Sequence, residues 1–584
     1  MLPANAKEYV VQSPHLLEYL LLFPVNTYGI PLFFSELKRD LKGMENPNII
    51  YPAGNETFIH IFPDQNDVRN FYIPIEPSFL HGVAATQVYI EEKMIDVIDK
   101  LKDDPITEEE RAEVLKKVLR EIIYIRKPGE SFKSLKGAAE EKKGIKDRIT
   151  SFLNKDFSAD LSKTEIPDNI PMTPDGKFIL SIQEYRSLEY LLIRDKIEMG
   201  VLKPFLSDPY IEDITCNGVG PIFIEHKIFK GLKSAVEFRE TDEIDDFVIK
   251  MAEKMKRPLT YRDPIVDATL PNGSRINIVY GTEISKNGSN FTIRRFADDP
   301  PSILNLIEWK TADYVMAAYV WICMEFGMSM FVSGETASGK TTTLNAITTF
   351  IPPENKIVTI EDTPELTLPH KNWTREVSKG KGSGEGEGGS ITMFDLLRAA
   401  LRQRPNQILV GEIRGSEGAV AFGAMQTGHP VMSTFHAASV EKLIQRLCSE
   451  PINIPMTHVD NLNLVIIQSA VRRPTGEMVR RILNINELVG YDPETGGFSF
   501  VAMFVWNPVT DEFEFTGRGS SYLLENKIAT ILGIPDDKRS EIYFEVDKRA
   551  RILERLHKAG YMDFWDLYHM IAKIKKQGLL KIEV

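Results

Sequence analysis

The chain has 584 residues, which is too long for a single hydrophobic core, so we expect two to four domains. Hydrophobic residues make up 43% of the chain and charged residues 26%, as in ordinary globular proteins, and the formal net charge of −13 argues against nucleic acid as the main partner. The three cysteines, Cys216, Cys323 and Cys448, are far apart and form no C-x-x-C pair. Neither a disulfide framework nor a structural zinc site is therefore expected.

Two stretches bear on targeting. The start of the chain, MLPANAKEYVV, lacks the basic residues and apolar core of a signal peptide. The most apolar window, 315–332, contains Glu325 and runs directly into a glycine-rich motif, so we predict a buried helix followed by a buried strand rather than a membrane span. We expect the protein to act in the cytoplasm and to reach a membrane only through partner proteins.

The first part of the chain shows no residues that suggest chemistry. Residues 1–130 alternate short apolar runs with turn residues and are expected to form an α/β extension; that it docks a partner is a hypothesis. Within it, 106–125 predicts an amphipathic helix with acidic residues first and basic residues later. Residues 131–170 are charged and poor in aromatics, which predicts a linker.

A second domain of mixed α/β structure is expected at 171–297. The pattern predicts a long amphipathic helix at 182–206, strands within 211–229, a helix at 242–255, and a hairpin turn at Asn272-Gly273 between later strands. Arg275, Arg294 and Arg295 lie on or beside those strands, where an arginine is more often solvated than functional. Paired prolines in 298–301 predict a hinge.

The third region, 302–584, alternates helix and strand in the manner of a parallel sheet covered on both faces. Its tract 379–390 is of low complexity and is predicted to be a mobile loop. After Gly428 we expect a more helical chain, with an amphipathic segment at 439–447, a polar hairpin at 491–515, and helices from 540 onward. The predicted strands are 330–333, 356–360, 407–410 and 431–433.

The stretch 334–341, GETASGKT, fits the phosphate-loop pattern G-x-x-x-x-G-K-[ST] at every fixed position. Gly334 and Gly339 let successive amides point at phosphate oxygens, Lys340 supplies a positive charge, and the Thr341 hydroxyl can bind Mg²⁺. A glycine-rich turn that binds nothing is the alternative, which the apolar strand before the loop and the helix after it disfavour. The residues expected to contact a nucleotide are Gly334, Glu335, Thr336, Ala337, Ser338, Gly339, Lys340, Thr341 and Thr342.

Two further apolar strands end in carboxylates. Glu361-Asp362 and Glu365 follow the first, and Glu412 follows the second. Because ligands of open α/β sheets lie beyond the carboxyl ends of the strands, these acids are expected to meet at the phosphates and metal, where a carboxylate can activate water. Ordinary solvated acids are the alternative. His429 and His436 flank a later strand and are favoured as γ-phosphate sensors over metal ligands, because no third ligand accompanies them.

Four segments, taken together, resemble a known family. They are GETASGKT, TIEDTPEL, LRAALRQRPNQILVGEIRG and TGHPVMSTFHA, which resemble the Walker A motif, aspartate box, Walker B motif and histidine box of the secretion superfamily of hexameric ATPases. This superfamily comprises the assembly motors of type II secretion, type IV pili and the archaellum, and the type IV secretion ATPases. The flanks LIRDKIEMGVLKPFLSDPYIEDITCNGVGPIFIEH and RRILNINELVGYDPETGGFSF are most similar to the archaeal branch. The likeness covers about 182–574.

The resemblance implies a fold and a set of roles. It implies a RecA-like P-loop NTPase domain at 302–584, a PAS-like mixed α/β domain at 171–297, and an extra N-terminal α/β extension. By this resemblance Glu365 would activate the attacking water, and Glu412 would act on the Mg²⁺ and water network. Lys340 would bind the phosphates, and His436 would sense the γ-phosphate. Arg275 and Arg294 would approach ATP from the same or a neighbouring subunit, with Arg295 as an alternative. Thr341 and, partly through water, Glu412 would hold the magnesium.

The same resemblance implies a homo-hexamer that uses ATP and Mg²⁺ at the cytoplasmic face of a membrane. Its partner would be a polytopic platform protein that moves pilin-like subunits. Gly415 follows Arg414 where bacterial members usually have Asp, and the tetracysteine module of bacterial extension motors is missing, so no zinc is expected. A regulatory nucleotide switch that does not turn over is one alternative. A DNA-translocating motor is another, which the acidic net charge disfavours.

Overall fold

The computed structural model describes most of the chain and divides it into two compact units, Met1–Phe296 and Ala297–Val584. Among the described residues, every helix is either too short or too polar to cross a bilayer. The predicted linker at 131–170, nearly all of the low-complexity tract, and residues 298 and 299 of the predicted hinge lie outside the described part. The described residues are 6–44, 46–64, 67–77, 84–98, 105, 107–127, 171–295, 300–379, 390–473, 476–492, 494 and 497–578.

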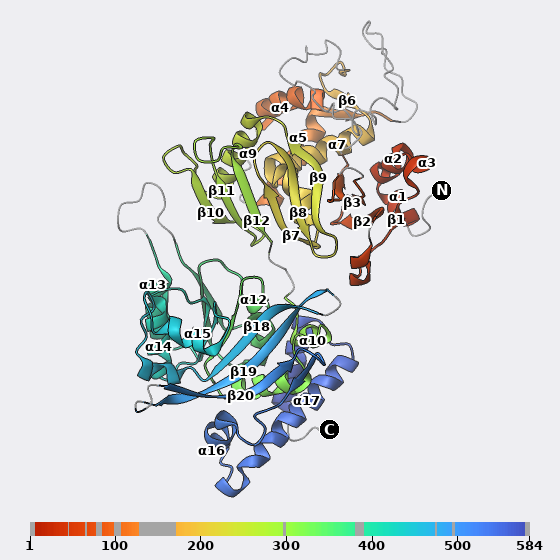
Figure 1. The fold of residues 1–584 in the computed structure, drawn as a ribbon. Helices are drawn as coiled ribbons and strands as arrows, with labels where there is room; N and C mark the ends of the chain where they lie inside the picture. The colour runs from red at the N-terminus through yellow and green to blue at the C-terminus, as the bar shows by residue number, and fades with distance from the viewer. Residues whose placement is uncertain are drawn as a thin grey trace. The chain divides into compact units, whose positions relative to one another are not determined.

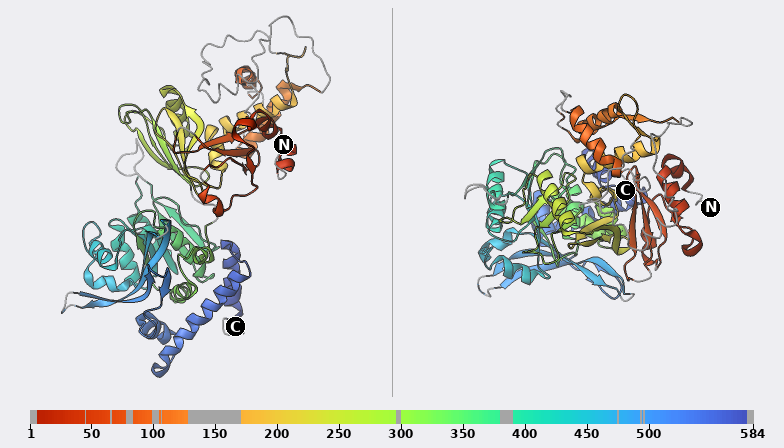
Figure 2. Two further views of the ribbon diagram at one scale, coloured as in Figure 1. Left: turned by 45° about the vertical axis from the view of Figure 1, so that its right-hand side comes forward. Right: turned by 90° about the horizontal axis from the view of Figure 1, so that it is seen from above.

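The first unit is built on a ten-stranded sheet of order β1-β2-β3-β4-β9-β8-β7-β12-β11-β10. Strands β4 and β9 pair in parallel, with Phe71 opposite Lys233. One sheet therefore joins the predicted extension to the predicted second domain, and the red strands continue the yellow ones in Figures 1 and 2. The strands are β1 Leu32–Phe33, β2 Ile49–Ala53, β3 Thr57–Phe62, β4 Phe71–Ile75, β7 Ile211–Cys216, β8 Gly220–His226, β9 Lys230–Phe238, β10 Ile265–Thr269, β11 Arg275–Val279 and β12 Asn290–Arg294.

A buried carboxylate ties the two halves of this sheet together. Asp208 is fully buried and accepts hydrogen bonds from Tyr51 on β2 at 2.7 Å and Tyr72 on β4 at 3.0 Å. Burial raises the pKa of Asp208. Arg295 donates to the main-chain oxygen of Asp208. Because a buried polar group is costly unless it is paired, this network fixes β2 and β4 to the residues before β7.

Helices of the first unit largely follow the predicted pattern. The helices predicted at 106–125 and 242–255 are confirmed as α5 and α9, and the Asn272-Gly273 turn joins β10 to β11. The single helix predicted at 182–206 is wrong in its second half: a π-helical turn follows α7, and Gly200 takes a φ of +58°, which an α-helix does not allow. The helices are α1 Lys7–Gln12, α2 Pro14–Leu22, α3 Val25–Tyr28, α4 Ala84–Ile98, α5 Glu108–Ile122, α7 Ile182–Leu192, α8 Lys203–Ser207 and α9 Thr241–Lys254, and β5 Ile123–Ile125 pairs with β6 Phe178–Leu180.

The second unit is built on a nine-stranded sheet of order β15-β14-β16-β17-β13-β18-β19-β20-β21. The strands from β15 to β18 are parallel, as predicted, and those from β18 to β21 are antiparallel. The prediction of a more helical chain after Gly428 was therefore wrong for 464–490, whereas the hairpin predicted at 491–515 is confirmed by the antiparallel strands β20 and β21. The strands are β13 Met330–Gly334, β14 Ile357–Glu361, β15 Trp373–Val377, β16 Gln407–Glu412, β17 Val431–Phe435, β18 Leu464–Arg472, β19 Met478–Asp492, β20 Gly497–Asn507 and β21 Glu512–Glu514.

Helices cover both faces of this second sheet. Met330 and Val332 on β13 pack into the core that contains α11 and α17, whereas Phe331 between them packs into the opposite core. The apolar window 315–332 is confirmed as the buried helix α11 followed by the buried strand β13. The helices are α10 Ile303–Glu308, α11 Tyr314–Glu325, α12 Lys340–Ile347, α13 Met393–Arg402, α14 Glu417–Gln426, α15 Val440–Leu447, α16 Ala529–Ile531, α17 Ile542–Lys558 and α18 Phe564–Gln577.

Candidate active site

The glycine-rich motif forms a tight loop between β13 and α12. A side chain at Gly334 would place its Cβ 2.0 Å from the main-chain oxygen of Gln468. Gly339 has a φ of +93°, and a Cβ on this residue would lie 3.0 Å from Gln468 Nε2. Only glycine fits at either place. Ala337 between them also has a positive φ, +61°. The loop thus has the close-packed, turned backbone that cradles a phosphate.

Side chains from β18 and β19 support this loop from outside the motif. Thr343 on α12 donates to Gln468 Oε1 at 2.7 Å, and Arg480 Nε donates to the main-chain oxygen of Ala337 at 3.1 Å. Gln468 is buried and Arg480 is exposed. Neither residue was predicted as part of the site: Gln468 lies outside the quoted segments, Arg480 opens the flank RRILNINELVGYDPETGGFSF with no role assigned to it, and their strands were not predicted.

Arg480→Ala is expected to weaken nucleotide binding about 3- to 10-fold, because one exposed hydrogen bond that stabilises the strained residue Ala337 is lost and such a bond contributes roughly 0.5–1.5 kcal/mol. Titration with a fluorescent nucleotide measures the affinity. Arg472→Ala, which removes an exposed arginine from β18, is the matched control and should leave the affinity unchanged. Equal affinities for the Arg480 variant and the control would contradict the role.

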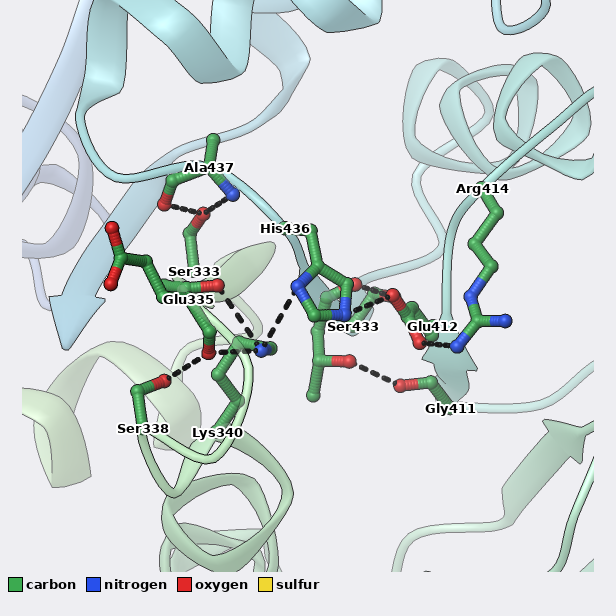
Figure 3. A network of polar contacts seen from close by, with 12 residues as sticks. Ser333, Glu335, Ser338, Lys340, Gly411, Glu412, Arg414, Ser433, His436 and Ala437 are labelled. Atoms are coloured by element: carbon green, nitrogen blue, oxygen red, sulfur yellow. Dashed lines mark hydrogen bonds and ion pairs between the residues drawn. The ribbon is translucent and has the colours of Figure 1, made fainter. Parts of the chain in front are cut away.

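Lys340 is at the centre of a polar network (Figure 3). Its side chain is only 8% exposed, and its Nζ donates to the main-chain oxygens of Gly334 at 3.1 Å and Glu335 at 2.8 Å. The same ammonium lies 3.4 Å from His436 Nδ1. Burial lowers the pKa of Lys340, and the carboxylates of Glu412 and Glu365 oppose that shift. The Lys340 ammonium therefore lies inside the phosphate loop, where main-chain oxygens of the loop bind it.

His436 connects Lys340 to Glu412. Its Nε2 lies 2.9 Å from Glu412 Oε1, and Arg414 Nη2 lies 2.5 Å from the other oxygen of that carboxylate. Burial lowers the pKa of His436, although Glu412 acts in the opposite direction, and the net shift favours the neutral ring. With the proton on Nε2, Nδ1 can accept from the ammonium, while Nε2 and Glu412 Oε1 are in close contact without an aligned hydrogen bond.

Glu365 lies on the loop after β14. Its main-chain oxygen accepts a hydrogen bond at 3.2 Å from Asn345 on α12, the helix that begins with Lys340, and its carboxylate is among the charges that act on the pKa values of Lys340 and Arg414. Its main-chain N–H donates to Glu361, a carboxylate that is 1% exposed and whose pKa burial raises to about 7. The structure thus brings Lys340, Glu365, Glu412 and His436 together at the carboxyl ends of the parallel strands. The roles assigned to them remain predictions.

The raised pKa of Glu361 predicts a pH-dependent stability. Between the ordinary pKa of 4.5 and the folded-state value of about 7, the folded protein binds more protons than the unfolded chain, so stability falls as pH rises through this window. The charged groups nearby are Arg375, with Nε 3.4 Å from Oε2, and Glu365. Through Glu361 the free energy of unfolding of the wild type should fall by roughly 2–3 kcal/mol between pH 5 and pH 8, and Glu361→Gln should abolish this part of the decrease. Urea unfolding at both pH values measures it, and equal pH slopes for the two proteins would contradict it.

His429 does not share the site. It precedes β17, at the opposite end of the strand from His436, and its Nδ1 lies 3.2 Å from the hydroxyl of Thr427. The prediction that both histidines sense phosphate was therefore wrong for His429. Only a residue that follows a strand lies at the carboxyl edge of the sheet.

The predicted arginines lie in the first unit. Arg275 on β11 and Arg294 on β12 are directly opposite each other, and they form ion pairs with Asp267 at 2.9 Å and Asp213 at 3.0 Å. Both guanidinium groups are well exposed, whereas Arg295 is half-buried and bound to the main chain at Asp208. Of the three, Arg275 and Arg294 are the better candidates for a ligand, which remains a prediction.

No zinc site is evident in the part of the chain that the structure describes, where no three or more His, Cys, Asp or Glu residues are grouped to hold a metal. Cys216 and Cys323 are buried, and Cys448 is half-buried.

The phosphate loop between β13 and α12, on a sheet whose neighbouring strands are parallel, defines the second unit as a P-loop domain. A sequence model of the family described as "Type II/IV secretion system protein" matches residues 195–494, and the chain belongs to this family. This membership confirms the resemblance found from the four motifs.

Relatives agree with this assignment. An uncharacterized protein of Methanocaldococcus jannaschii is 42% identical over 585 residues, covering 99% of this chain and 98% of the relative. The VirB11 protein of Agrobacterium fabrum is 29% identical over 43% of this chain and 79% of its own length. Among solved structures, the Legionella pneumophila ATPase DotB is 19% identical, covers 64% of this chain and 89% of that one, and has a TM-score of 0.36, too low for a conclusion about the fold. The Methanocaldococcus jannaschii relative is archaeal, in agreement with the resemblance to the archaeal branch.

Proposed function

We propose that this protein hydrolyses Mg-ATP and works as a homo-hexameric motor for a secretion or pilus-assembly system. The observation that carries the proposal is the contact chain from Lys340 through His436 to Glu412, with Glu365 beside it on the adjacent loop. These groups supply what phosphoryl transfer to water requires: a charge on the phosphates, a carboxylate for the water and a sensor between them.

The residues of the site have distinct tasks in this proposal. The loop amides and Lys340 hold the phosphates, and the ammonium exchanges its two main-chain oxygen partners for phosphate oxygens. Thr341 and, partly through water, Glu412 would hold magnesium, which when bound neutralises charge on the phosphates. Glu365 orients and deprotonates the attacking water. His436 relays the presence of the γ-phosphate to Glu412.

The exposed arginines complete the proposal. Arg275 on β11 and Arg294 on β12 are paired across the two strands. They would approach ATP from the same or a neighbouring subunit and stabilise charge on the transferring phosphoryl group. Residues 298–301 would act as the hinge between 171–297 and 302–584, so that binding and hydrolysis close and release the two parts. The mechanical output would go to a polytopic membrane platform protein that moves pilin-like subunits at the cytoplasmic face of the membrane.

Phosphate release tests the enzymatic part. The purified full-length chain is expected to release phosphate from ATP steadily when magnesium is present and to stop when EDTA is added. Binding of ATP without turnover would instead favour the regulatory switch. Turnover that depends on added DNA would favour a translocating motor. Particle images of the protein with a non-hydrolysable ATP analogue test for the six-fold ring.

Docking through residues 1–130 needs a separate test. Deletion of this segment would remove β4 from its pairing with β9 and expose a new sheet edge, so point changes are preferable. Val11 and Leu21 are 83% and 74% exposed on α1 and α2. Val11→Asp with Leu21→Asp should reduce recovery of the platform protein from native membranes while leaving phosphate release unchanged. Unchanged recovery would reject docking through these helices.

A further inference from the structure

The loop that carries Glu365 is held by two side chains that lie outside it. At the end of β14, Glu361 accepts hydrogen bonds from the N–H groups of Glu365 at 2.7 Å and Leu366 at 2.8 Å. On α12, Asn345 donates through Nδ2 to the main-chain oxygen of Glu365 at 3.2 Å and accepts at Oδ1 from the N–H of Thr367 at 3.0 Å. Both main-chain polar groups of Glu365 are thus bound by side chains.

Asn345 links this loop to the phosphate cradle. It lies on α12, the helix that begins with Lys340, and its side chain is 7% exposed. Asparagine is a poor residue for the inside of a helix, because its amide competes for main-chain partners. Here the amide uses one donor and one acceptor on a segment about twenty residues away, so the same short helix touches the phosphate loop and the Glu365 loop.

Glu361 is fixed in turn by the neighbouring strand. A Cβ at Gly411 on β16 would lie 3.2 Å from Glu361 Cγ, so the strand that ends in Glu412 packs closely against the Glu361 side chain. Arg375 on β15 faces its other oxygen at 3.4 Å. Three strands and one helix therefore set the main chain at Glu365.

We propose that Asn345 and Glu361 are positioning residues, which fix the main chain of Glu365 relative to the phosphate loop so that its carboxylate meets the attacking water. This proposal rests on the proposed function, in which Glu365 activates that water. A displacement of about 1 Å at a reacting group can reduce turnover about 100-fold, which makes a main-chain clamp of this kind effective. Because the side-chain hydrogen bonds of Asn345 go to the main chain of the Glu365 loop, its loss should affect kcat and not nucleotide affinity.

Single substitutions test the clamp through kcat, nucleotide affinity and thermal stability. Asn345→Ala and Glu361→Ala are each expected to lower kcat about 10- to 100-fold and to change the affinity for a fluorescent ATP analogue less than about 3-fold. Glu361→Gln keeps an oxygen that accepts both N–H groups and should retain most of kcat. Thr349→Val is the matched control, since this buried hydroxyl follows α12 and donates to the carbonyl of Ala346 in the turn before it.

A double-substitution cycle shows whether the effect passes through Glu365. Asn345→Ala should lower kcat when Glu365 is present and have no further effect in the Glu365→Gln protein, measured by single-turnover phosphate release. An equal loss in both backgrounds, or an Asn345→Ala protein with kcat within 3-fold of wild type, would overturn the clamp. Asn345→Asp keeps the acceptor and loses the donor, and it provides the same comparison if the alanine variant does not fold.

The same data separate this proposal from the proposed function. If the wild type does not hydrolyse ATP, or if Glu365→Gln hydrolyses it at the wild-type rate, the proposed function fails and the clamp fails with it. If the wild type turns over and Glu365→Gln does not, while Asn345→Ala and Glu361→Ala retain full activity, only the clamp is overturned.

Discussion

Lys340→Ala is expected to abolish ATP hydrolysis by removing nucleotide binding. The ammonium is the positive group within the loop, and charge-assisted contacts of this kind contribute about 1.5–3 kcal/mol each, so the affinity should fall at least about 100-fold when contacts to two phosphates are lost. Titration with a fluorescent ATP analogue measures the affinity. The variant should remain folded, because burial disfavours the charge and lowers the pKa of this lysine.

Lys356→Ala is the matched control for this substitution. Lys356 also donates to a main-chain oxygen, that of Gln403 at 2.7 Å, but it precedes β14 and lies at the other end of the strand from the site. The control should bind ATP as the wild type does. Retention of wild-type affinity by Lys340→Ala would show that the loop does not bind phosphate through this lysine.

Glu365→Gln is expected to bind ATP and fail to hydrolyse it. Removing a general base typically lowers the rate 100- to 10,000-fold, and the amide cannot accept a proton from water. The affinity should be kept, because Glu361 and Asn345 bind the main chain of Glu365 and not its carboxylate. Phosphate release under steady-state conditions gives kcat, and equilibrium titration with labelled ATP gives the affinity.

Glu354→Gln provides the control for this second substitution. Glu354 is an exposed acid that precedes β14, at the opposite end of that strand from the site, and it forms an ion pair with Lys575 at 3.1 Å. Its loss should leave kcat within about 2-fold of the wild type, since an exposed acid of this kind contributes little to catalysis or stability. A Glu365→Gln protein with near-normal kcat would transfer the role of base to Glu412, which Glu412→Gln would then test.

Much of the fold could be predicted where the signal is local. The helix α9, the Asn272-Gly273 hairpin and the succession of α11 and β13 follow from residue spacing over ten to twenty positions. The prediction of one helix at 182–206 was wrong in its second half, because the apolar periodicity continues through Gly200 but the helical backbone does not. Likewise, the apolar residues at the start of β18 are all buried, so that half of the strand shows no alternation to distinguish it from a buried helix.

The candidate site divides in the same way. Sequence alone identified the phosphate loop and the strand-end acids Glu365 and Glu412. It did not identify Gln468 or Arg480, which lie more than 120 positions after the residues that they contact. It also did not identify Asn345 as a residue that holds the main chain of Glu365. Asn345 sits inside a helix in the sequence, where nothing distinguishes a buried amide with partners from a solvated one.

The sequence by itself determined the phosphate cradle, because the turn between β13 and α12 depends on eight adjacent residues and on glycine where any Cβ would collide or φ is positive. Only the tertiary structure decided which side chains surround that cradle and that residues 1–130 share a sheet with 171–297. These arrangements depend on which strand edges pair and which buried polar groups find partners across the fold, and neither is encoded in the spacing of nearby residues.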